Sequence, residues 1–119
     1  MLINGHKQDS VPATDRGLPY GDGLFETIAV VGGRPCLWQR HLQRLMAGCC
    51  RLGIAAPEPE QLHDEVLQEI AGSGDGVIRI TLTRGSGERG YAPPATAHPT
   101  RIVQWCEGRS PKPGDSLTP

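Results

Sequence analysis

Three absences narrow the function classes open to this chain of 119 residues. No run approaches the ~18 consecutive apolar residues that span a bilayer. The N-terminal segment lacks the charged start and the long apolar core of a signal peptide. The formal net charge is −1, from 12 basic and 13 acidic residues, which argues against general binding of nucleic acids or membrane surfaces. We therefore expect a cytoplasmic protein that binds neither nucleic acid nor membranes.

Cysteine and metal motifs are also sparse. The four cysteines, at positions 36, 49, 50 and 106, show neither zinc-ligand spacing nor the framework of a secreted domain. Cys49 and Cys50 are adjacent within a helical pattern, where we expect small core or boundary residues. The sequence also lacks a His-Glu-x-x-His zinc motif and an ordered Ser-His-Asp set. We predict no metal site, and free thiols fit a reduced setting.

Lysine is scarce, and arginine takes its place. The only two lysines are Lys7 and Lys112, so ten of the 12 basic residues are arginine. A guanidinium group binds carboxylate and phosphate through paired hydrogen bonds, so this bias fits small anionic ligands. A GC-rich genome, which favours Arg, Gly, Pro and Ala, explains the same composition equally well.

The hydrophobic pattern predicts a strand, a hairpin, two helices and two further strands. This grouping is typical of an α+β fold, in which two helices pack on one face of a mainly antiparallel sheet. The predicted strands cover residues 2–8 (with a turn or bulge at Asn4-Gly5), 24–31, 34–37, 77–84 and 100–106. The first helix is predicted over 39–52, and the second opens at 57–60 and ends before the glycines at 72–76.

Apolar spacing predicts the buried face of each helix. The first helix shows the i, i+3, i+4, i+7 pattern, and Gly53 follows it where a left-handed cap is expected. The predicted buried residues are Leu42, Leu45, Met46, Cys49 and Leu52 in the first helix, and Leu62, Val66, Leu67 and Ile70 in the second.

Residues 107–119 have the composition of a linker. We therefore expect residues 1–106 to form an N-terminal domain and 107–119 to lead to a second domain that this chain does not contain.

Three segments contain candidate site residues. Gly21 and Gly23 bracket Asp22 before a strand, so the backbone there can take positive φ or approach another group closely. Taken alone, such a segment is more often a surface turn. In the first helix, His41 and Arg44 share a face, and Arg44 in a cleft could hold a phosphate. The alternatives are a surface arginine and a packed or capping histidine.

The third segment, residues 85–90, matches the G-x-G-x-x-G pattern of dinucleotide sites. Pro93-Pro94 follows, however, and prevents the helix that such a site needs. We interpret the segment as a loop that presents Arg84, Arg89 and Tyr91, with two arginines as a carboxylate trap. A solvated charged loop is equally consistent with the sequence.

Together, the three segments resemble the fold-type-IV pyridoxal-phosphate enzymes, over about residues 1–106. They are Asp15–Glu26, His41–Leu45 and Thr83–Tyr91. This family includes branched-chain aminotransferases, D-amino-acid aminotransferases and 4-amino-4-deoxychorismate lyases. The opening Leu2–His6 and the Arg84–Tyr91 loop are most similar to the lyase branch.

The resemblance implies roles for four residues. Arg44 would bind the phosphate of pyridoxal 5′-phosphate, and Phe25 would line the substrate pocket, where D-amino-acid enzymes carry tyrosine. Arg89 and Tyr91 would meet the substrate, usually in the pocket of the partner subunit, so a homodimer is expected. D-amino-acid enzymes carry histidine at the position of Tyr91, which favours the lyase branch.

For the complete protein, the resemblance implies conversion of 4-amino-4-deoxychorismate into 4-aminobenzoate, a folate precursor, and pyruvate. The two carboxylates of this substrate fit the arginine supply. The family's Schiff-base lysine lies in the second domain, and neither Lys7 nor Lys112 matches its position. We therefore expect no catalytic residue in this chain, which would be inactive alone.

Two alternatives stay open. One is a pyridoxal-phosphate aminotransferase of branched-chain or D-amino acids on the same scaffold. The other is a non-catalytic domain that binds anions or another protein.

Overall fold

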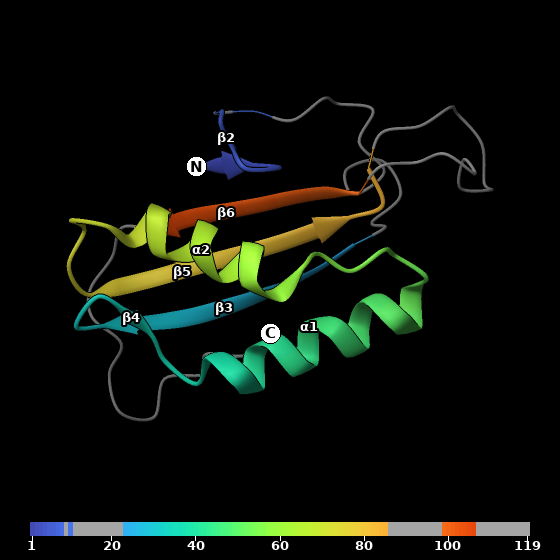
Figure 1. Ribbon diagram of the computed structural model, residues 1–119, viewed down its shortest axis with the longest axis horizontal. Helices are drawn as coiled ribbons and strands as arrows, with labels where there is room; N and C mark the ends of the chain where they lie inside the picture. Colours follow the sequence, from blue (N-terminus) through green and yellow to red (C-terminus); the bar gives the residue numbers. More distant parts are fainter. Residues whose placement is uncertain (9, 11–22, 86–98, 107–119) are drawn as a thin grey trace.

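The computed structural model describes residues 1–8, 10, 23–85 and 99–106 (Figure 1). Several sequence predictions lie outside these residues. They concern the polar turns before Gly23, the glycine-rich loop with Arg89 and Tyr91, and the linker at 107–119.

Six strands form one sheet in the order β2-β1-β6-β5-β3-β4, with every pair antiparallel. Both helices lie on the same face of this sheet, α1 along β3 and α2 over β6 (Figure 1). The predicted α+β fold is therefore confirmed. The strands are β1 (Leu2–Ile3), β2 (His6–Lys7), β3 (Gly23–Val31), β4 (Arg34–Pro35), β5 (Gly76–Thr83) and β6 (Thr100–Cys106), and the helices are α1 (Trp38–Leu52) and α2 (Pro59–Ile70).

The core lies between the sheet and the two helices. Successive side chains of a strand point to opposite faces, so the even-numbered residues of β3 and β5 form the layer beneath the helices. The fully buried members of these two strands are Ile28, Val30, Ile78, Ile80 and Leu82. Within the described ranges, neither helix is long and apolar enough to cross a membrane.

The helices bury narrower faces than the sequence predicts. Leu45 and Cys49 of α1 are buried, whereas the side chain of Leu52 is 39% exposed. Leu52 is the last residue of α1, where the chain already turns into its cap. In α2, Leu67 is 38% exposed because it is one position off the stripe of Leu62, Val66 and Ile70, whose members recur every fourth residue. The prediction of burial was wrong for Leu52 and Leu67.

Glycines close the turns as the sequence predicts. Gly32 and Gly33 have φ angles of 61° and 75°, the two positive values that a two-residue hairpin turn requires. Gly53 has φ 70° and caps α1 in the left-handed conformation. Residues 2–8 form a hairpin rather than one strand, because Asn4 and Gly5 both take positive φ.

The strand that returns from the Gly32-Gly33 turn is shorter than predicted. It ends at Pro35 rather than at residue 37. Leu37 has φ 55°, which breaks the extended backbone and leads directly into α1.

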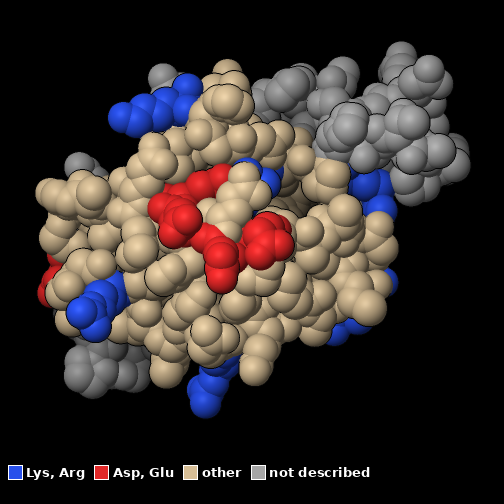
Figure 2. Space-filling model, viewed as in Figure 1, with Lys and Arg blue, Asp and Glu red and all other residues tan. Residues whose placement is uncertain are grey.

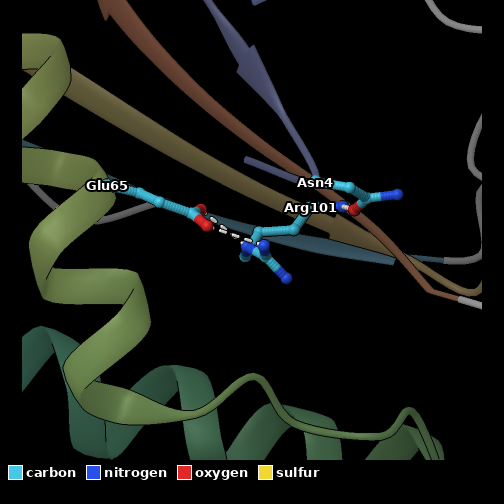
Figure 3. Close-up of polar contacts among 3 residues, drawn as sticks. All are labelled: Asn4, Glu65 and Arg101. Carbon is cyan, nitrogen blue, oxygen red and sulfur yellow. Dashed lines mark hydrogen bonds and ion pairs between the residues drawn. The ribbon is translucent and has the colours of Figure 1, made fainter. Parts of the chain in front are cut away.

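A polar cluster ties β1, β6 and α2 together (Figure 3). The guanidinium of Arg101 donates two hydrogen bonds to the carboxylate of Glu65, from Nε to Oε1 and from Nη2 to Oε2, both 2.7 Å long. Asn4 Oδ1 accepts a hydrogen bond from the Arg101 backbone N–H at 2.7 Å, and the Asn4 N–H donates to the Arg101 carbonyl at 2.7 Å. The part-buried bidentate pair therefore links α2 directly to β6.

Charge separates between the two helices. Helix α1 contains three arginines and no acidic residue, whereas α2 contains four acidic residues and no lysine or arginine. Figure 2 shows the acidic side chains gathered over α2 in the middle of this face. An anionic ligand is therefore favoured beside α1 rather than beside α2.

The neighbouring cysteines of α1 should differ sharply in reactivity. Burial raises the pKa of the Cys49 thiol, so its thiolate fraction at neutral pH is lower than that of an ordinary cysteine. Cys50 is exposed. We expect iodoacetamide to alkylate Cys50 in the folded protein well before Cys49, as followed by peptide mass spectrometry. Equal alkylation rates for Cys49 and Cys50 in the folded protein would contradict the burial of Cys49.

Candidate functional site

A pocket of about 460 Å³ lies between α1 and the first half of β3. Strand β4 pairs with β3 only at Val30 and Val31, so in the described part of the chain the edge of β3 near Gly23 has no neighbouring strand. Alternate backbone N–H and C=O groups of such an edge point outward. The pocket is lined by Gly23, Leu24, Phe25, Glu26, Arg44, Ala47 and Arg51.

Helix α1 contributes two arginines to this pocket. Arg44, Ala47 and Arg51 are three and four residues apart and therefore lie on one face of the helix. The Arg44 side chain is 41% exposed, so its guanidinium is accessible. Arg51 has no ionic partner among the described residues. This arrangement provides several N–H donors for an oxyanion, with the small Ala47 between them.

A buried carboxylate holds α1 in place beside the pocket. Glu26 lies on the core side of β3, with its side chain 5% exposed. Its Oε1 is 2.7 Å from His41 Nδ1, and its Oε2 is 3.7 Å from Arg44 Nε. The His41 side chain is 3% exposed, which confirms the interpretation as a packed histidine. Glu26 thus links β3 to two successive turns of α1 and orients Arg44.

Phe25 lies on the other side of the same strand edge. It follows Leu24 and precedes Glu26, so its ring points away from the helices. The ring is 38% exposed and lies beneath the guanidinium of Arg79, with the Arg79 Cζ 4.4 Å from the ring centroid. Phe25 and Arg44, which the sequence singles out separately, nevertheless both border the pocket at this strand edge. Their roles in binding stay predictions.

Arg84, which the sequence predicts to be part of a carboxylate trap, has a structural role. Arg84 donates hydrogen bonds from Nη2 to the carbonyl of Leu52 at 2.5 Å and from Nη1 to that of Gly53 at 3.2 Å. These contacts satisfy carbonyls at the end of α1, where a cation is also favoured by the helix dipole. The fold therefore uses Arg84 to cap a helix, whereas Arg89, the other arginine of the predicted carboxylate trap, lies outside the described residues.

Sequence reasoning assigned no role to Glu26 or Arg51. The signal for Arg51 is its spacing of seven from Arg44, two helical turns along the same face. The signal for Glu26 is weaker: a carboxylate in the apolar alternation of a strand requires a buried partner, which the sequence does not identify.

Gly23 permits a close approach to a neighbouring group, one of the two uses that the sequence suggests for this glycine. A Cβ on Gly23 would lie 2.5 Å from the carbonyl oxygen of Leu82 and 3.2 Å from Cα of Thr83, both on the neighbouring β5. The glycine therefore permits a close approach of two strands at the rim of the pocket.

The chain belongs to the amino-transferase class IV family, whose sequence profile matches residues 23–112. Among curated relatives, it is 35% identical over 101 residues to the aminodeoxychorismate lyase of Vibrio harveyi, covering 85% of this chain and 37% of that protein. It is 36% identical over 102 residues to the bifunctional aminodeoxychorismate lyase/D-amino acid transaminase of Mycobacterium tuberculosis, covering 76% and 34%. The chain thus spans just over a third of the length of these relatives.

Solved structures agree with this assignment. The 4-amino-4-deoxychorismate lyase of Pseudomonas aeruginosa is 49% identical, with a TM-score of 0.80 over 87% of this chain and 38% of that one. The branched-chain amino acid aminotransferase of Escherichia coli is 21% identical, with a TM-score of 0.79 over 87% and 38%, and at this identity shows the fold alone.

Replacing His41 should destabilise the fold through Glu26. In a His41→Ala variant, the buried carboxylate loses its short hydrogen bond, so we expect a loss of about 2–4 kcal/mol in the free energy of unfolding. His41→Gln keeps an N–H donor and should lose less. Urea denaturation measures both values. A His41→Ala variant as stable as the parent would show that the contact is dispensable.

Adding one methyl group at Gly23 should also be costly. Gly23→Ala forces β3 and β5 apart beside the pocket, and we expect about 1–3 kcal/mol of destabilisation in thermal or urea unfolding. The matched control is Gly33→Asn, where nothing lies within 4 Å of the added Cβ and asparagine tolerates the positive φ. Equal stability of the two variants would contradict the close approach.

Proposed function

We propose that the chain is the N-terminal domain of an aminodeoxychorismate lyase, which converts 4-amino-4-deoxychorismate into 4-aminobenzoate and pyruvate. The observation that carries this proposal is the 49% identity to the P. aeruginosa lyase, with a TM-score of 0.80. The V. harveyi relative supports the same activity. In this proposal, a second domain supplies the catalytic lysine.

Pyridoxal 5′-phosphate is the cofactor that the family implies, and the pocket residues fit its phosphate. Arg44 and Arg51 present guanidinium donors from one helix face, and Gly23 and Ala47 take little space between them. Guanidinium groups match the geometry of phosphate oxygens. When bound, the cofactor supplies an electron sink for bond cleavage at the carbon next to the substrate amine.

The residues of this chain would hold the reactants rather than react. Glu26 keeps Arg44 in place from beneath, so the arginine binds the phosphate without a search for its orientation. Phe25 provides an apolar wall beside the bound substrate. The family resemblance further suggests a homodimer, in which the segment with Arg89 and Tyr91 meets the partner's pocket.

A second candidate is a pyridoxal-phosphate aminotransferase. It is supported by the M. tuberculosis relative, which is named for both activities. The chain is also 35% identical over 107 residues to a protein of Methanocaldococcus jannaschii that is named as a branched-chain-amino-acid aminotransferase.

Product analysis of the protein expressed from the complete gene separates these candidates. The lyase releases 4-aminobenzoate and pyruvate from 4-amino-4-deoxychorismate, whereas an aminotransferase moves an amino group to a 2-oxo acid. Detection of amino-group transfer alone, without 4-aminobenzoate and pyruvate, would reject the lyase proposal. Sequencing beyond the codon of Pro119 tests the enzyme proposal itself. The enzyme proposal fails if no lysine-bearing domain follows in the same chain and no companion chain supplies one.

Arg44→Gln should weaken cofactor binding in that protein. Loss of charged hydrogen bonds to phosphate predicts about 10- to 100-fold lower affinity for pyridoxal 5′-phosphate. The affinity is measured by titrating the apoprotein and following the absorbance of bound cofactor. Arg40→Gln is the control, because Arg40 is an exposed arginine of the same helix that does not line the pocket. Equal affinity of the two variants would remove Arg44 from the site.

A further inference from the structure

A groove of about 310 Å³ lies between the first two turns of α1 and the first two turns of α2. Trp38, Leu42 and Pro59 form its apolar surface. Trp38 and Leu42 also pack against the hydrophobic core, which fixes this side of the groove. The His63 ring approaches Trp38 from α2, with 5.0 Å between the ring centroids and 48° between the ring planes. Trp38 is only half-buried, so the groove presents part of an aromatic ring.

Two carboxylates line the α2 side of this groove. Glu60 and Asp64 are four residues apart, so they lie on one face of the helix, about 6 Å apart along its axis. Both are exposed, and neither forms an ion pair with a residue that the structure describes. The helix dipole favours an acid at Glu60, in the first turn, but gives no such support to Asp64. The groove therefore has negative charge that the described residues do not compensate.

The same face of α2 continues into an exposed apolar side chain. Leu67 follows Glu60 and Asp64 at the i, i+4, i+7 spacing of one helix face, and it is 38% exposed. Figure 2 shows that acidic side chains gather over α2 as a whole. The face from Glu60 to Leu67 spans about 10 Å of helix, which exceeds the reach of one small cation and suits a segment of polypeptide chain.

The groove is separate from the pocket that contains Arg44 and Arg51. Successive residues of a helix are rotated by about 100°, which places Trp38 and Leu42 nearly opposite those two arginines around α1. The groove and the pocket share no lining residue in the part of the chain that the structure describes. A ligand in the groove would therefore leave the pocket accessible.

An arginine side chain matches the chemistry of this groove. Its guanidinium can stack on an indole ring and at the same time donate paired hydrogen bonds to a carboxylate. Trp38 of α1 and Asp64 of α2 supply these two surfaces. The aliphatic stem of the arginine would pack on Leu42 and Pro59. Charge and shape thus both favour a basic occupant.

We propose that this groove is a docking site for a basic segment of a partner protein. The segment inserts one arginine side chain between Trp38 and the carboxylates of Glu60 and Asp64, and an apolar residue of the same segment covers Leu67. This interaction goes beyond the proposed function, because it uses neither the cofactor pocket nor the helix-free face of the sheet.

Fluorescence anisotropy of the protein expressed from the complete gene tests this proposal. The probe is a fluorescein-labelled peptide of nine residues, made of arginine, leucine and glycine, and its control contains citrulline, which keeps the shape of arginine without the charge. We expect the arginine peptide to bind at least about 10-fold more tightly than the citrulline peptide. Asp64→Asn should lower the affinity for the arginine peptide about 3- to 10-fold.

Glu58→Gln is the matched control variant. Glu58 is an exposed acid that directly precedes α2, makes no capping hydrogen bond and does not line the groove. Its replacement removes the same charge and should change the affinity less than about 2-fold. Equal affinity of the parent and Asp64→Asn would overturn the proposal. Equal losses in Asp64→Asn and Glu58→Gln would also overturn it, because they would show general charge attraction without a defined groove.

Two further measurements exclude other occupants. Competition by Nα-acetylarginine amide at the concentration of the peptide would identify a small cation as the ligand. A change of oligomeric state in Asp64→Asn, seen by sedimentation velocity, would identify a second copy of this chain. Either result would overturn docking of a partner protein. Because peptide binding rather than turnover is measured, failure of the lyase assignment would leave this test unchanged.

Discussion

The ion-pair contact of Glu26 determines where the functional side of this domain lies. A carboxylate in the core-facing row of β3 would cost several kcal/mol if it were left alone. It is tolerated because His41 approaches to 2.7 Å and Arg44 lies 3.7 Å from its second oxygen. The requirement to satisfy one buried charge therefore fixes α1 on β3, and with it the direction of the arginine that faces the pocket.

Local features of the fold could be predicted because they depend on neighbours in the sequence. The alternation around Ile28 and Ile80 and the glycines at 32, 33 and 53 each specify a backbone state within a few residues. The exposure of Leu52 and Leu67 depends instead on where α1 ends and on which face of α2 turns toward the sheet. No local pattern contains that information.

The candidate site was predictable only in part, for the same reason. Arg44 and Phe25 could be named from motifs, but their meeting in one pocket required the placement of α1 against β3. The capping role of Arg84 depends on the end of a helix more than 30 residues earlier in the chain. The position of Arg79 follows from the strand register, which the sequence constrains but does not state.

The pairing of residue 4 with residue 101 has a consequence for synthesis on the ribosome. Strand β1 is made first, yet its place in the sheet lies between β2 and β6, and β6 is the last strand of the described chain to be made. Because translation adds about 5–20 residues per second, roughly 5–20 s separate the synthesis of the N-terminal hairpin from that of β6. During this interval Leu2, which is buried in the finished domain, stays accessible to chaperones and to other chains.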